Sequence, residues 1–110
     1  MGLLWEHYVL NELHARLQTR RINYWRDKQG HEVDFVLARR GEPPLAIECK
    51  WSANDFDPGA LKVFAARYPK AEVFVVTQDV DRSYAKHYGD LKVSFTGLES
   101  LVRRLEKAPT

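Results

Sequence analysis

The sequence predicts an α/β domain with a mixed central sheet and helices on both sides, in the order α-β-β-β-α-β. Residues 3–18 lack Pro and Gly and are rich in Leu, Glu, Ala and Arg, which favours a helix. Residues 21–51 contain β-branched and aromatic runs separated by turn residues, which indicates a three-stranded meander. Apolar residues at helical spacing over 61–68, followed by the β-branched run 72–77, add a helix and a strand buried on both faces beside a parallel neighbour.

Length and composition limit the class of protein. The chain has 110 residues and 45% hydrophobic residues, so we expect one domain over residues 1–110, which could be part of a longer protein. A formal net charge of +2 permits a nucleic-acid partner without requiring one. The single cysteine, Cys49, excludes an internal disulfide and a cysteine-based zinc cluster, and it fits a reducing, cytoplasmic setting. We find no signal peptide, no membrane span and no Walker-type phosphate loop, so a nucleotide-driven motor would lie elsewhere.

The predicted first helix carries a glutamate on its apolar face. At 100° per residue, Val9, Leu10, Leu13 and Leu17 all fall within about 60° of Glu6. Glu6 therefore lies in the middle of the stripe that should pack against the sheet.

The predicted meander has turns at 27–30 and 39–44, and it ends in the stretch "LAIECKWS" at 45–52. Successive side chains of a strand alternate between the two faces of the sheet. Alternation puts Cys49 and Trp51 on one face, and it puts Glu48 and Lys50 together on the other.

The remaining elements follow the second predicted helix, 61–68, which Pro69 closes. We expect a short helical turn at 83–89 and a final edge strand at 91–95. Thr96 and Glu99 spell a capping box, and an apolar stripe behind them predicts a last helix.

Three acids and one lysine form the candidate site: Glu6, Asp34 in the second strand, and Glu48 with Lys50 in the third. If the second and third strands pair, these side chains can converge on one pocket. An oxygen-only cluster suits Mg²⁺ or Mn²⁺, and the backbone carbonyl of Cys49 could complete the coordination. This chemistry favours metal-assisted phosphodiester hydrolysis, in which Lys50 positions the attacking water or stabilises the transition state.

These residues and their order resemble the PD-(D/E)xK nuclease superfamily over nearly the whole chain. That family has a restriction-endonuclease-like α-β-β-β-α-β core with an acid on the first helix, an Asp on the second strand and an acid-x-Lys on the third. Here the matching residues are Glu6, Asp34 in "HEVDFV", and Glu48 and Lys50 in "IECK". No Pro precedes Asp34, which departs from the first signature element.

Within that superfamily the phrases "YWRDKQGHEVDFVL", "IECKWS" and "GLESLV" look most like a nuclease-like domain at the C-terminus of prokaryotic ATPases. Archaeal Holliday-junction resolvases are similar more distantly. The resemblance implies a Mg²⁺-dependent DNA endonuclease, fused to or associated with an ATPase. It implies catalytic roles for Lys50, Glu48, Asp34 and Glu6, and metal binding by the three acids. Ser52 and Gln29 are implied as accessories.

The same residues could instead have a purely structural role. Glu6 and Lys50 could form a semi-buried ion pair between helix and sheet, and Asp34 could balance Arg26 or Lys28. His31 is the one histidine kept as a candidate phosphate contact. Several basic residues could line a DNA groove: Arg16, Arg20, Arg21, Arg26, Lys28, Arg39 and Arg40.

Two further functions compete with the nuclease. One is a non-catalytic domain that binds nucleic acid or a partner protein as the regulatory end of an ATPase. The other is a structural module that dimerises through the edge strand at 91–95 and the last helix, so a homodimer is a further expectation.

Overall fold

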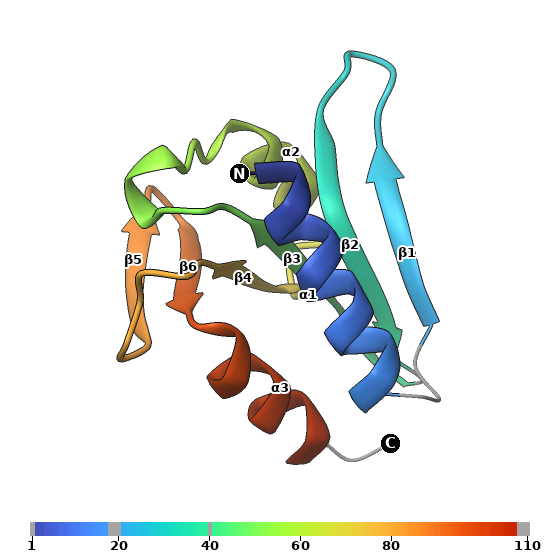
Figure 1. Ribbon diagram of the computed structural model, residues 1–110. Helices are drawn as coiled ribbons and strands as arrows, with labels where there is room; N and C mark the ends of the chain where they lie inside the picture. The colour runs from blue at the N-terminus through green and yellow to red at the C-terminus, as the bar shows by residue number, and fades with distance from the viewer. Residues whose placement is uncertain (1, 18–20, 40, 108–110) are drawn as a thin grey trace.

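The protein, seen here in a computed structural model, is described at residues 2–17, 21–39 and 41–107. Its elements, in chain order, are α1 (Gly2–Arg16), β1 (Arg21–Arg26), β2 (Glu32–Arg39), β3 (Glu42–Cys49), the short 3-10 helix η1 (Ala53–Asp55), α2 (Gly59–Arg67), β4 (Glu72–Val76), β5 (Tyr84–Tyr88), β6 (Leu91–Thr96) and α3 (Leu98–Lys107). The predicted α-β-β-β-α-β order is confirmed from α1 to β4 (Figure 1).

The strands form a six-stranded sheet in the order β1-β2-β3-β4-β6-β5. β1, β2 and β3 are the predicted antiparallel meander. β4 lies between β3 and β6 and is parallel to both, and its last four residues are buried. This confirms the mixed sheet and the predicted central strand, because a strand with neighbours on both sides and helices over both faces has no solvent-facing side.

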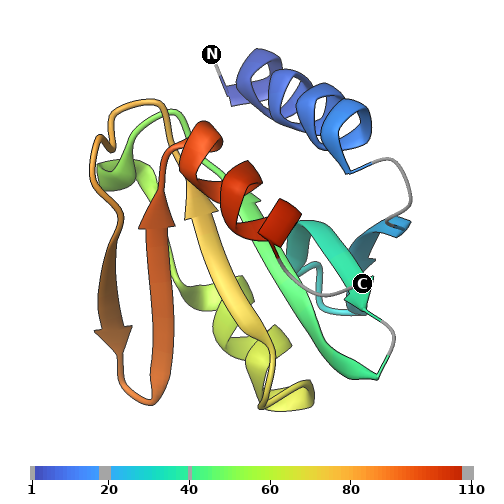
Figure 2. The ribbon, with the colours of Figure 1, turned by 90° about the horizontal axis from the view of Figure 1, so that it is seen from below.

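Two hydrophobic cores lie on the two faces of the sheet. α1 and α3 pack on one face, and α2 packs on the other (Figure 2). Val9 and Leu13 of α1, with Leu101 of α3, belong to the first core, and Leu61 and Phe64 of α2 belong to the second. The apolar stripes read from the sequence therefore face the sheet, as predicted.

The segment 83–89 differs from the prediction. It contains the strand β5, which pairs antiparallel with β6 through a turn at Gly89, whose φ is +65°. β5 is therefore an outer strand of the sheet, and β6 lies inside it between β4 and β5. Four of the five β5 residues are exposed, so the segment lacks the alternating burial that identifies a strand from its sequence.

Two predicted boundaries shift slightly. The first helix ends at Arg16 rather than near residue 18, which lies outside the described residues. The second turn of the meander is tighter than 39–44, because β3 already begins at Glu42 after Gly41, whose φ of +74° suits glycine. No described helix is long and apolar enough to cross a membrane.

β2 carries a bulge at Asp34. β1 pairs Asn23 with Val36 and Trp25 with Val33, so two residues of β2 lie opposite one residue of β1. Val33 and Val36 consequently pack on the α2 face, while the intervening Phe35 packs on the α1 face. The extra residue in β2 is what changes the direction of the Asp34 side chain.

Candidate functional site

An open pocket of about 400 Å³ lies where β3 ends beside the N-terminal half of α1. It is lined by Gly2, Glu6, Asp34, Cys49, Lys50, Trp51 and Asp55. The structure thus brings Glu6, Asp34 and Lys50 together from three separate segments. Glu48, the fourth predicted residue, does not line this pocket but lies beside Asp34.

Asp34 and Glu48 meet where the β2–β3 pairing ends. The last pair of the ladder at this end is Phe35 with Ile47, so continuing the register would place Asp34 opposite Glu48. Here side chains take over from backbone pairing. The Asp34 amide donates to Glu48 Oε1 at 3.2 Å, and the Cys49 amide donates to Asp34 Oδ2 at 2.8 Å. Each carboxylate is held in place by a backbone donor, which orients it without neutralising its charge.

Lys50 lies just beyond the end of β3. β3 ends at Cys49, and the Lys50 amide donates to the Val76 carbonyl at 3.1 Å. Cys49, Lys50 and Trp51 all line the same pocket. The predicted alternation holds only inside a strand, and both Lys50 and Trp51 come after the end of β3. Glu48 lies inside the strand, between Ile47 and Cys49, which both belong to the hydrophobic core on the α1 face. Its side chain therefore alternates in direction with theirs.

Glu6 is fixed by its neighbour on α1. The Trp5 indole donates to the Val76 carbonyl at 3.1 Å, and its ring lies edge-on to Trp51 with centroids 5.9 Å apart. This contact ties the first turns of α1 to the end of β4, beside Lys50. Partial burial, and then the charge and hydrogen bonding of Asp34, raise the pKa of Glu6 above its ordinary value. Asp34 is thus close enough to Glu6 to oppose its ionisation.

Glu48 has the strongest perturbation among the acids of the site. Burial, followed by the charge of Asp34, raises the pKa of Glu48 from 4.5 to about 7. The Asp34 amide and the positive charge of Lys50 act in the opposite direction but do not cancel the rise. A cation placed near Glu48 would lower this pKa, because a cation favours the charged form of a carboxylate.

In the described part of the chain, the structure shows neither of the ion pairs considered as structural alternatives, Glu6 with Lys50 or Asp34 with Arg26 or Lys28. Among the described residues, no ion pair within 4.0 Å joins Lys50 to Glu6 or Glu48. Arg26 lies 3.6 Å from Glu32 instead of pairing with Asp34. The acids and Lys50 therefore lie near one another, but none of the ion pairs among the described residues joins Lys50 to these acids.

Cys49 contributes its backbone and a buried thiol. Its side chain is 7% exposed and belongs to the α1-side core. Burial, and then the charges of Asp34 and the other site acids, raise the pKa of the Cys49 thiol above its ordinary value. A thiol in this state remains protonated and packs as a small apolar group.

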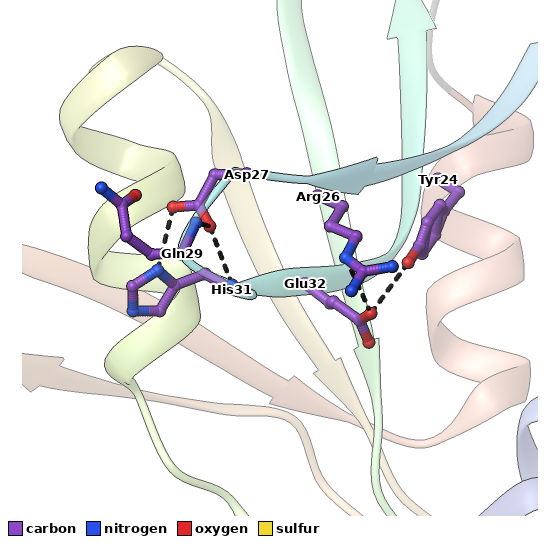
Figure 3. Close-up of polar contacts among 6 residues, drawn as sticks. All are labelled: Tyr24, Arg26, Asp27, Gln29, His31 and Glu32. Atoms are coloured by element: carbon purple, nitrogen blue, oxygen red, sulfur yellow. Dashed lines mark hydrogen bonds and ion pairs between the residues drawn. The ribbon is translucent and has the colours of Figure 1, made fainter.

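The accessory candidates have structural partners. Ser52 caps η1, and its hydroxyl donates to Asp79 Oδ2 at 2.8 Å. Gln29 and His31 lie in the β1–β2 hairpin, outside the pocket lining (Figure 3). The His31 ring Nδ1 lies 2.9 Å from Asp27 Oδ2.

Asp55 was missed by sequence reasoning. It lies in η1 and adds a third acid to the pocket lining, beside Glu6 and Asp34. The only signal for it is its position shortly after "IECKWS", since a loop that follows a site strand often returns to the site.

The acids around the pocket suit a metal ion that needs only one or two carboxylate ligands. Among the described residues, no three His, Cys, Asp or Glu side chains are arranged so that they could hold a metal ion together. Mg²⁺, however, is usually held by one or two carboxylates while it keeps several waters. Asp34 and Glu48 fit that smaller requirement, since they are adjacent oxygen donors whose charges oppose each other.

Several predicted groove residues already have partners. Arg16 pairs with two acids of α3, Glu99 at 2.9 Å and Glu106 at 3.2 Å. Arg39 donates to the Pro43 carbonyl at 2.8 Å and lies 3.4 Å from Glu72. Arg20 and Arg40 lie outside the described residues.

Comparison with known families gives one match. The model of a family described as Domain of unknown function (DUF4143) matches residues 1–96, which include the whole candidate site. No curated protein matches the chain.

Proposed function

Since the chain belongs to the DUF4143 family, whose description assigns no function, we infer the function from the candidate site, and we propose that the protein is a metal-dependent DNA endonuclease that hydrolyses phosphodiester bonds. The observation that carries the proposal is that Glu6, Asp34 and Lys50 line one pocket open to solvent, with Glu48 beside Asp34. Among the described residues, Lys50 forms no ion pair within 4.0 Å with these acids. The likeness to PD-(D/E)xK nucleases, drawn from the same four residues, supports it.

Asp34 and Glu48 would hold Mg²⁺ or Mn²⁺, with Glu6 as an outer partner, and with the Cys49 carbonyl nearby. When bound, the ion would lower the pKa of a coordinated water and offset negative charge on the phosphate. The Cys49 and Asp34 amides orient the two carboxylates before any ion arrives. That arrangement reduces the reorganisation that binding requires.

Lys50 supplies the positive charge that the reaction needs. Its backbone is held by β4, so its side chain enters the pocket from a rigid element. The ammonium group would orient the attacking water and stabilise the charge that develops on the phosphoryl oxygens. Glu6 would accept a proton or position a water, since burial and the charge of Asp34 raise its pKa above the ordinary value and so make it a better base.

The direct test is cleavage of plasmid, nicked and branched DNA with Mg²⁺ or Mn²⁺. Lys50→Ala and Asp34→Asn should each reduce the rate at least about 100-fold, the usual effect of losing a transition-state charge or a metal ligand. The matched controls are Lys62→Ala on α2 and Asp90→Asn in the β5–β6 turn, which are exposed and outside the pocket. Equal cleavage by the wild type and both site variants would rule out the proposed active site.

The alternative is a non-catalytic domain that binds nucleic acid or a partner protein, for instance at the end of an ATPase. The observation that favours it is that one oxygen of Asp34 and one of Glu48 already accept backbone hydrogen bonds. A calorimetric Mn²⁺ titration of the wild type and Asp34→Asn separates the two functions. Heat of binding that Asp34→Asn abolishes supports the nuclease, whereas DNA binding with no Mn²⁺ binding supports the alternative.

A further inference from the structure

The turn of the β1–β2 hairpin carries a second polar pocket, separate from the candidate site. It has a volume of about 530 Å³ and is lined by Arg26, Asp27, Lys28, Gln29 and Arg67. Four of these residues come from the hairpin, and Arg67 comes from the last turn of α2. We call Arg26, Lys28, Gln29 and Arg67 the hairpin cluster.

Among the described residues, Asp27 is the one acid that lines this pocket, and its oxygens are used within the turn. Oδ1 accepts from the amides of Gln29 at 3.0 Å and of His31 at 2.8 Å, and Oδ2 lies 2.9 Å from His31 Nδ1 (Figure 3). Burial raises the pKa of Asp27, but the hydrogen bonds from His31 and Gln29 outweigh it and hold the pKa below its ordinary value. Asp27 therefore shapes the turn and stays ionised.

The cations of the cluster are weakly compensated. Among the described residues, Lys28 and Arg67 take part in no ion pair within 4.0 Å. Arg26 lies 3.6 Å from Glu32 Oε1, an oxygen that also accepts the Tyr24 hydroxyl at 2.9 Å (Figure 3). Even with Arg26 near Glu32, the two cations Lys28 and Arg67 outnumber Asp27 in the described lining, so the pocket attracts an anion.

The hairpin cluster lies close to the candidate site along β2. Gly30 ends the turn, and Asp34 follows four residues later. At about 3.3 Å per residue, the Cα atoms of Gly30 and Asp34 are at most about 13 Å apart.

We propose that the hairpin cluster binds the phosphate backbone of the nucleic-acid substrate near the bond that is cut. This rests on the proposed function, which supplies the polyanion and the nearby reaction site. Arg26, Lys28 and Arg67 contact phosphates, and Gln29 offers an uncharged donor beside them. These contacts raise affinity without reading sequence, since phosphates carry no base information.

The test measures duplex binding in EDTA by fluorescence anisotropy over a range of salt concentrations. In the variant Lys28→Ala/Arg67→Ala, the slope of log affinity against log salt should fall by about 1.8, or about 0.9 for each phosphate that the variant no longer neutralises. The control Lys62→Ala/Lys86→Ala also removes two positive charges, from exposed positions outside the cluster, and should keep the wild-type slope.

Three results would overturn the proposal: a slope equal to that of the wild type, an equal fall in the control, or no duplex binding by the wild type. A further arm uses polyglutamate, and binding of polyglutamate as tight as that of DNA would assign the cluster to acidic proteins instead. Cleavage assays separate this proposal from the nuclease itself. If no DNA is cleaved but the variant still lowers the salt slope, only the proposed active site is contradicted. If cleavage is normal but the variant leaves the salt slope unchanged, only the proposed role of the hairpin cluster is contradicted.

Discussion

Glu48 lies where burial and the Asp34 carboxylate both oppose its charge, so the stability of the metal-free protein should depend on its protonation. Its pKa of about 7 in the folded state exceeds the ordinary 4.5, so the folded protein holds a proton that the unfolded chain releases. This contribution is complete below about pH 4.5 and is lost as the pH rises through 7. The difference corresponds to about 3 kcal/mol at most, because the pair with Asp34 shares the effect.

The variant Glu48→Gln keeps an oxygen for the Asp34 amide and removes the ionisation. In EDTA, wild type should lose about 1–3 kcal/mol of unfolding free energy between pH 5 and pH 9 relative to Glu48→Gln. Urea unfolding at several pH values measures this difference. Glu12→Gln on α1, which changes an acid outside the site, should follow wild type, and parallel pH profiles for wild type and Glu48→Gln would contradict the prediction.

At the scale of residues, the sequence located much of the candidate site. Asp34, Glu48 and Lys50 could be found because charged residues inside apolar strands are costly unless they are used. Glu6 could be found because helical periodicity placed it on an apolar face. The orientation of Lys50 could not, since it depends on where β3 ends, and Asp55 could not, since its place depends on how η1 folds back.

At the scale of elements, the junction between β6 and α3 depends on Gly97. A Cβ at this position would lie 2.9 Å from the backbone oxygen of Val80, a contact that a side chain rotation cannot relieve. Gly97→Ala should therefore destabilise the fold by about 1–3 kcal/mol, the usual cost of overpacking. Urea unfolding followed by circular dichroism measures the change.

Gly2→Ala is the matched control for this substitution, because a Cβ at Gly2 meets nothing within 4 Å. It lies at the start of α1, where alanine favours the helix, so it should leave stability unchanged or slightly increased. If Gly97→Ala were as stable as Gly2→Ala, the close approach of Val80 to Gly97 would not exist in solution.

Elements differed in how well the sequence predicted them. β4 and the three helices carry apolar patterns that match their burial, so their type was predicted correctly. β5 was not, because its side chains are mostly exposed and its pairing with β6 is set by the Gly89 turn. The bulge at Asp34 is a register effect between two strands, and no local pattern in β2 reveals it.

At the scale of the whole molecule, the fold assembles the pocket from three separate segments. α1 brings Glu6, β2 brings Asp34, and the chain just after β3 brings Lys50. Glu48 lies within β3, beside Asp34. β5 and β1 form the outer strands of the described sheet, so self-association through β5 remains a prediction, now for this strand rather than for 91–95.

Because the site joins α1, β2 and β3, a cation bound there should stabilise the entire domain. An ion that binds only the folded state adds about 2.7 kcal/mol when its concentration is 100 times its dissociation constant. For a domain of this size we expect Tm to rise by about 10 °C in saturating Mn²⁺. Differential scanning fluorimetry, with ionic strength matched by NaCl, measures the shift.

The proton on Glu48 makes this stabilisation depend on pH. An ion must displace that proton, so the rise in Tm should be smaller at pH 5.5 than at pH 8, on either side of a pKa of about 7. Asp34→Asn should lose most of the rise at both pH values, since it keeps an oxygen for the Cys49 amide but removes a charged ligand. Asp90→Asn, in the distant β5–β6 turn, should retain the full rise. An equal rise in Asp34→Asn and Asp90→Asn would place the Mn²⁺ elsewhere on the molecule and leave the acids around Lys50 without the ion that we assign to them.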